Sequence, residues 1–317
     1  MEILGSVEVF LEMGLIFSIL AMGYYVSYTI LDFPDLTVEG TYLTGAVVFG
    51  LFVANGLNPW LGLICAFVWG CIFGAVTGLL HVKLGIRPLL CGILVSTGLI
   101  TVNLVGVTAG LAGDFKAETT SIISFGRDTA TLQDAFLGDL IPIRLKSLGN
   151  IPLRMLVIFL VVAVVCKILL DLYLKTKNGL LLRATGNNQQ FVKMLGVDPG
   201  RSKIIGLAIG NGFAAVSGAL YTHTADGVNQ SMGIGMVVIG LASLIIGTSL
   251  FGKVKFMAPT TKVMLGAIIY QACLVVVQKL GIPSAYNKLI MAVIFTLVLV
   301  LGFKAKRKNG GVKNAKA

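Results

Sequence analysis

The side chains of this 317-residue chain that could take part in chemistry gather at one break in a long apolar pattern. Pro34 ends a helix there, and Asp35 is placed to cap the next one. Thr37 and Glu39 follow near the positive end of that second helix. Interrupted helices are tolerated at membrane depth where they line a cavity. The break therefore predicts a polar solute pathway or, as the plainer alternative, an acidic helix cap at a membrane surface.

A few other polar side chains lie inside apolar stretches, where ionisable groups are costly. Asn103 and Asn211 either face a pathway or hydrogen-bond across helices. Lys167 and Asp171 are four residues apart and are expected to pair. Glu12 is within reach of a membrane surface, so its carboxylate is equally compatible with a functional and a structural position.

No pattern predicts catalysis or metal binding. The two histidines and the five cysteines lack metal-ligand spacing. Residues 247–253 have the glycine and lysine spacing of a phosphate-binding loop, but Val254 stands where that loop needs serine or threonine. The sequence therefore predicts no catalytic residue, no metal ligand and no ATP site in this chain.

Composition sets the fold class. Hydrophobic residues make up 56% of the chain and charged residues 12%, about half the roughly 25% that is usual in soluble domains. This composition excludes a soluble globule, a disordered chain and a disulfide-stapled secreted domain. The apolar runs are long and do not alternate, which excludes a transmembrane β-barrel. The prediction is an all-α, polytopic helical membrane protein.

Windows of about 20 apolar residues predict nine spans. They cover 9–31, 37–56, 59–82, 88–110, 152–174, 204–225, 231–251, 257–279 and 285–303. Together they form one transmembrane domain over residues 1–303.

Lysine and arginine fall on one side of these spans. The connection 175–203 and the tail 304–317 are rich in them, whereas 111–150 carries slightly more acids than bases. The positive-inside rule places the C-terminus and the basic tail in the cytoplasm, and the N-terminus and 111–150 outside. The net charge of +11 then indicates contact with membrane lipid rather than nucleic acid. The connection 175–203 is expected to form two short interfacial helices around 186–188, either for docking a partner or as a plain solvated loop.

Several short stretches, taken in chain order, resemble the permease subunits of ABC importers, in the branch that serves branched-chain amino acids, sugars and nucleosides. They are 35–40, the coupling-segment stretches 176–179, 183–188 and 195–197, the glycine-rich 206–220, and 247–253. Gln190 and Phe191 depart from the small residues usual in that coupling segment.

The resemblance implies a homodimer in a bacterial cell membrane, two copies of a separate ATPase, and an external solute-binding protein. ATP and magnesium would be bound by that ATPase, so this chain would need no cofactor and would not itself be an enzyme. The residues expected to couple to the ATPase are Gly179, Arg183, Ala184, Gly186, Asn188 and Gly196. The residues expected to make the solute pathway polar are Asp35, Thr37, Glu39, Asn103 and Asn211.

The sequence of residues 33–40 is most similar to a subgroup of this family linked to tryptophan or tyrosine uptake. The expected solute is therefore an aromatic or branched-chain amino acid. An alternative is an ion-coupled secondary transporter that uses Glu39 or Glu12. A third possibility is a channel-like scaffold. The chain shows no internal repeat of the kind that many secondary transporters have.

Overall fold

The fold is a bundle of long apolar helices, seen in a computed structural model. The structure describes residues 2–112, 123–124, 153–225, 227–252, 254, 256–279 and isolated positions between 286 and 297. Most of the segment 111–150, most of the ninth predicted span 285–303, and the tail 304–317 lie outside the described residues.

Eight helical segments in this part of the chain are long and apolar enough to cross a membrane, which confirms the predicted fold class. Each overlaps one of the first eight predicted spans. They cover Glu8–Ile30, Thr37–Ala54, Pro59–Leu84, Pro88–Gly106, Met155–Lys175, Pro199–Thr224, Gln230–Leu250 and Pro259–Val277.

Some helices extend beyond these windows, whereas α10 (Met236–Leu250) is shorter than its window, which begins with the 3-10 turn η2 (Gln230–Gly233). The long helices are α1 (Glu2–Tyr24), continued by a π-helical turn η1 (Tyr25–Ile30), then α2 (Thr37–Ala54), α3 (Pro59–Leu84), α4 (Pro88–Ala112), α6 (Leu153–Lys175), α9 (Pro199–Thr224), α10 and α11 (Pro259–Lys279).

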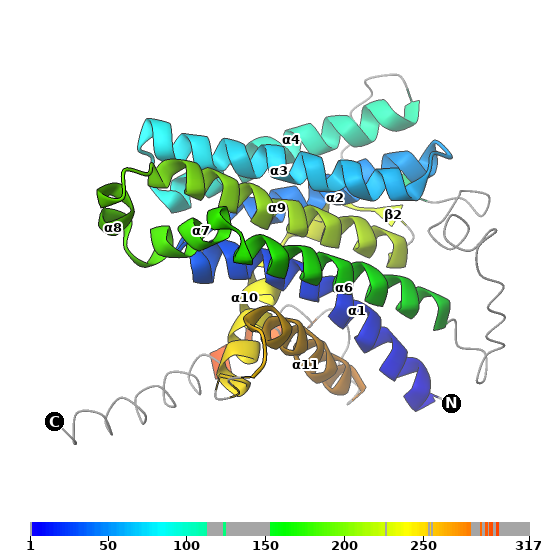
Figure 1. Ribbon diagram of the computed structural model, residues 1–317. Helices are drawn as coiled ribbons and strands as arrows, with labels where there is room; N and C mark the ends of the chain where they lie inside the picture. Colours follow the sequence, from blue (N-terminus) through cyan, green and yellow to red (C-terminus); the bar gives the residue numbers. More distant parts are fainter. Residues whose placement is uncertain are drawn as a thin grey trace.

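Helix α9 lies at the centre of the bundle, packed against α1, α2 and α3 (Figure 1). Glycines of α3 at four-residue spacing, Gly70, Gly74 and Gly78, lie at the contact between α3 and α9. A Cβ atom at Gly74 would overlap the backbone of α9 at Leu207. Helices α10 and α11 pack on each other and against α1, and they cross the other helices obliquely in Figure 1.

The sixth span begins earlier than predicted, at Pro199 instead of residue 204. The Asp198 side chain accepts a hydrogen bond from the Gly200 amide, and Pro199 occupies the first helical turn, where its missing N–H costs nothing. The end of the predicted coupling segment 175–203 is therefore the first turn of α9.

Two short strands pair at one end of the bundle. Strand β1 (Ile123–Ser124) runs antiparallel to β2 (Gly227–Val228), with Ile123 opposite Val228. Because β2 follows the C-terminal end of α9, this pair places residues 123–124 at that end of α9.

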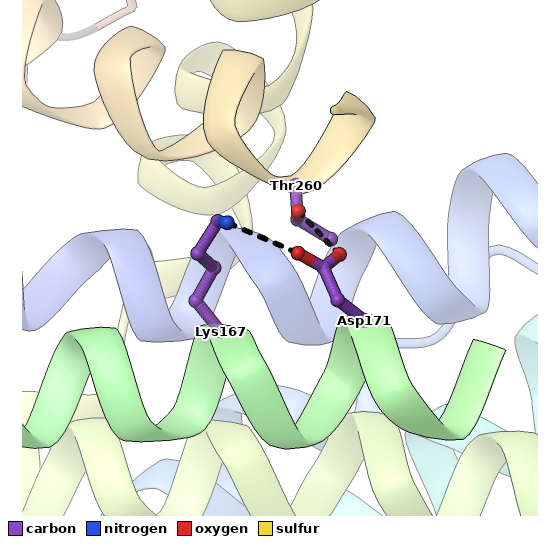
Figure 2. Close-up of polar contacts among 3 residues, drawn as sticks. All are labelled: Lys167, Asp171 and Thr260. Carbon is purple, nitrogen blue, oxygen red and sulfur yellow. Dashed lines mark hydrogen bonds and ion pairs between the residues drawn. The ribbon is translucent and has the colours of Figure 1, made fainter. Parts of the chain in front are cut away.

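The predicted pair Lys167–Asp171 is confirmed, with 3.1 Å between Nζ and Oδ2. Figure 2 shows that Asp171 also faces Thr260 at the start of α11, whose hydroxyl donates to the carboxylate at 2.6 Å. The pair therefore joins α6 to α11, which the sequence spacing did not indicate.

Candidate functional site

The connection between α6 and α9 folds into the two short helices that the sequence predicts, α7 (Lys177–Asn187) and α8 (Gln189–Met194). Each begins at a polar cap: Thr176 accepts from the Gly179 amide and Asn188 from the Phe191 amide. Gly196, with φ of +73°, then turns the chain toward α9. These helices sit at one end of the bundle (Figure 1). We call the segment from Thr176 to Gly196, which contains both helices and their caps, the elbow.

The elbow has a buried side and an exposed side. Leu182, Thr185 and Val192 are fully buried against the bundle. The outer side of α8 exposes Phe191 and, at 84% of its surface, Met194. An exposed apolar surface on a short, capped helix is typical of a docking site for another protein.

The predicted coupling residues divide between these two sides. Gly179 is buried, and Ala184 and Gly186 are partly buried, whereas Arg183, Asn188 and Gly196 are exposed. The structure thus brings all six into the elbow, three toward the bundle and three toward its surroundings.

Gly186 marks the closest approach between the elbow and the membrane helices. A Cβ atom there would overlap the carbonyl oxygen of Ile30, the last residue of η1. The chain leaves η1 through Leu31 and Asp32, and Asp32 has the left-handed φ of +54°. The elbow therefore contacts the chain just before the turn that leads to Asp35.

Asp35 is the centre of a buried polar network that joins α2, α3 and α9. One carboxylate oxygen accepts from the Thr37 amide, the first amide of α2, at 2.9 Å, although Leu36 and not the predicted Asp35 occupies the N-cap position. The other accepts from the Asn211 amide group at 2.6 Å, and Asn211 in turn accepts from Thr41 at 2.8 Å. The hydroxyls of Thr37 and Thr77 lie 2.8 Å apart.

The members of this network are almost completely hidden from solvent. Asp35 is 2% exposed, and the side chains of Thr37 and Asn211 are not exposed at all. Asp35 lies in the connection between the first two spans. Burial raises the pKa of its carboxyl, against the opposing effect of the bonds from Thr37 and Asn211.

Glu39 and Asn103 extend the polar contacts along α2. The Glu39 carboxylate accepts from the amide of Gly235, which caps α10, so it lies at the positive end of that helix. Asn103 donates to the carbonyl of Gly40 at 3.2 Å. Both asparagines of the predicted pathway therefore hydrogen-bond across helices. Their contact with a solute stays a prediction.

Sequence reasoning missed Thr41, Thr77 and Gly235. Thr41 carried a weak signal, since it falls four residues after Thr37 and so on the same face of α2. Thr77 and Gly235 carried none, because their partners lie far away in the sequence.

The described residues contain no group of three metal-binding side chains. Residues 247–250, the start of the false phosphate-loop match, form the last turn of α10, not a loop after a strand. The part of the chain that the structure describes thus gives no sign of an ATP site here.

The fold defines a class of protein: a polytopic helical membrane protein with two short helices between two of its spans. The chain matches, over residues 6–301, the family described as branched-chain amino acid transport system / permease component, and it belongs to that family. It is a permease subunit of an ABC importer.

Three relatives show the breadth of the family. The chain is 38% identical to a tyrosine transport system permease protein of Clostridioides difficile, over 91% of this chain and 88% of the relative. It is 28% identical to the fructose import permease protein FruF of Bifidobacterium longum, over 89% and 76%. It is 25% identical to the probable branched-chain amino acid transport permease protein LivH of Methanocaldococcus jannaschii, over 76% and 74%. No solved structure matches the chain significantly.

Proposed function

We propose that this permease moves an aromatic amino acid, with tyrosine as the first candidate, through a homodimer driven by two copies of an ATPase that dock on α7 and α8. An external solute-binding protein delivers the solute. ATP and magnesium stay on the ATPase, and this chain performs no catalysis. Its C-terminus and the elbow lie in the cytoplasm, and its N-terminus lies outside.

The exposed side of α8 is the observation that supports docking. Phe191, Met194 and Leu195 are each more than half exposed, on a segment that three successive caps hold in place. Apolar side chains on a rigid helix bind a groove with little loss of conformational entropy. Closure of the ATPase dimer would move α7, and α7 contacts η1 and α9.

The docking proposal is tested by co-purification of the ATPase with Met194→Glu. We expect the ATPase to be lost, because a carboxylate would be placed in an apolar contact. Leu57→Glu is the control: Leu57 is 51% exposed and lies in the connection between α2 and α3, away from α7 and α8. Equal retention of the ATPase by both variants would contradict the docking surface.

The solute proposal depends on the 38% identity to the tyrosine permease over nearly the whole of both chains. It is tested by ATP-dependent uptake into proteoliposomes that contain the permease, its ATPase and its binding protein. We expect uptake of tyrosine, with little uptake of leucine or fructose. Preferential uptake of fructose would overturn the solute assignment and leave the docking proposal intact.

A further inference from the structure

A groove with a volume of about 480 Å3 lies on the bundle between α3, α6 and α9. Figure 1 shows α9 lying between α3 and α6, so α9 forms the floor and the other two helices form the walls. Every lining side chain is aliphatic, aromatic or cysteine, and all come from membrane-spanning helices. The groove therefore suits a hydrocarbon ligand and offers nothing to a polar one.

The groove has a defined length. On α6 its lining recurs every four residues, from Val161 through Val165 and Leu169 to Tyr173. This distance is about 18 Å at the rise of an α-helix. One leaflet of a bilayer has a hydrocarbon depth of about 15 Å. The groove thus matches one acyl chain, whereas a helix of a second copy would need contact along most of a span, about 30 Å.

One end of the groove carries positive charge. The floor residues Ile209 and Phe213 continue a stripe of α9 that passes through exposed Ile205 to exposed Arg201, at four-residue intervals. This arrangement, with the aromatic ring of Tyr173 on one wall and the cation of Arg201 beyond the floor, suits the head group of an anionic lipid.

We infer that this groove is a binding site for one anionic phospholipid, with an acyl chain along α9 and the phosphate against Arg201. The positive-inside rule places the lipid in the cytoplasmic leaflet. The site shares no residue with the elbow surface or the Asp35 network, so it does not depend on the identity of the solute.

Native mass spectrometry of the purified full chain with added phosphatidylglycerol tests the site. Val165 lines the groove and Val164 does not, although both are valines on α6 with exposures of 47% and 37%. We expect Val165→Trp to lose the bound lipid and Val164→Trp to keep it. Equal retention or equal loss in the two variants would overturn the site.

A second pair of substitutions provides an independent test in case one of the valine variants misfolds. Leu169 lines the groove and Leu172 does not, and their exposures of 58% and 56% are nearly equal. Leu169→Trp should lose the lipid while Leu172→Trp keeps it. If the groove variants abolish association of two copies and leave the lipid bound, the groove is an interface between copies and the lipid site is wrong.

The head-group contact is tested with Arg201→Gln. We expect the preference for phosphatidylglycerol over phosphatidylcholine to fall about fivefold, as for the loss of one cation near an anionic lipid. An unchanged preference would contradict the proposed position of the phosphate.

Discussion

The elbow and the Asp35 network are built in opposite ways although both meet the short turn after η1. The elbow consists of short, capped helices with one side exposed, and it touches the bundle most closely at Gly186. The network is buried, and hydrogen bonds join its side chains across three helices. Exposed apolar side chains are available to a partner, whereas satisfied buried polar groups hold helices together.

The residue that the elbow contacts lies close in the chain to the start of the network. Ile30 contacts the elbow, and Asp35, which begins the network, follows five residues later. Under the function proposed above, the elbow receives force from the ATPase, the turn after η1 carries it toward α2, and the network keeps α2, α3 and α9 together.

The largest effect is expected from Asp35→Ala. The substitution removes the acceptor of the buried Thr37 amide and one of the two acceptors of the Asn211 amide group, at a cost on the order of 3 kcal/mol in the free energy of unfolding. Thermal unfolding in detergent measures it. Asp35→Asn keeps the side-chain shape and one of the two acceptor oxygens, so it should lose less. A variant as stable as wild type but inactive in uptake would show that Asp35 acts on the solute instead.

Gly186→Val separates the elbow from the turn without touching the network. The added side chain overlaps the Ile30 carbonyl, so α7 must shift outward. We expect ATP-driven uptake to fall about 5- to 150-fold, the range of typical coupling energies. The matched control is Gly98→Val, since a Cβ at Gly98 meets open space. Full uptake by Gly186→Val would remove the elbow from the coupling route.

Asp32 tests the turn between the two regions. A β-branched residue is strained at its φ of +54°, so Asp32→Val should destabilise the protein by about 1–2 kcal/mol. Asp32→Gly removes the strain and should be nearly neutral. Unfolding temperatures of both variants provide the comparison, and equal values would mean that the turn is not held in this conformation.

The smallest effect is expected from Thr77→Val, which removes the bond to the Thr37 hydroxyl and keeps the side-chain shape. Single hydrogen bonds between membrane helices are worth about 0.6 kcal/mol. The loss in unfolding free energy should therefore be near that value. A loss as large as that of Asp35→Ala would mean that the network fails as a unit.

Local features could be predicted from the sequence because their causes are local. Apolar runs locate the described spans, Pro34 and Asp35 mark the start of α2, and the asparagine at 188 separates α7 from α8. The partners across helices could not be predicted. Asp35 and Asn211 are 176 positions apart, and the contact of Gly186 with Ile30 depends on how α7 folds back against η1.

The predicted pathway residues show the same limit. Polar residues in apolar spans were recognisable one by one, but the sequence left open whether they face a solute or each other. In the structure, Asn211 and Asn103 form hydrogen bonds across helices. The carboxylate of Glu39, on α2, accepts a hydrogen bond from Gly235 at the start of α10.

Tyrosine uptake into proteoliposomes, measured with and without the ATPase and ATP, is the most direct test of a permease that is driven through its elbow. We predict uptake only when the ATPase, ATP and the binding protein are all present, and none with Met194→Glu, which should not hold the ATPase. Undiminished uptake by the permease alone, or by Met194→Glu, would contradict the proposal that force enters this chain through α7 and α8.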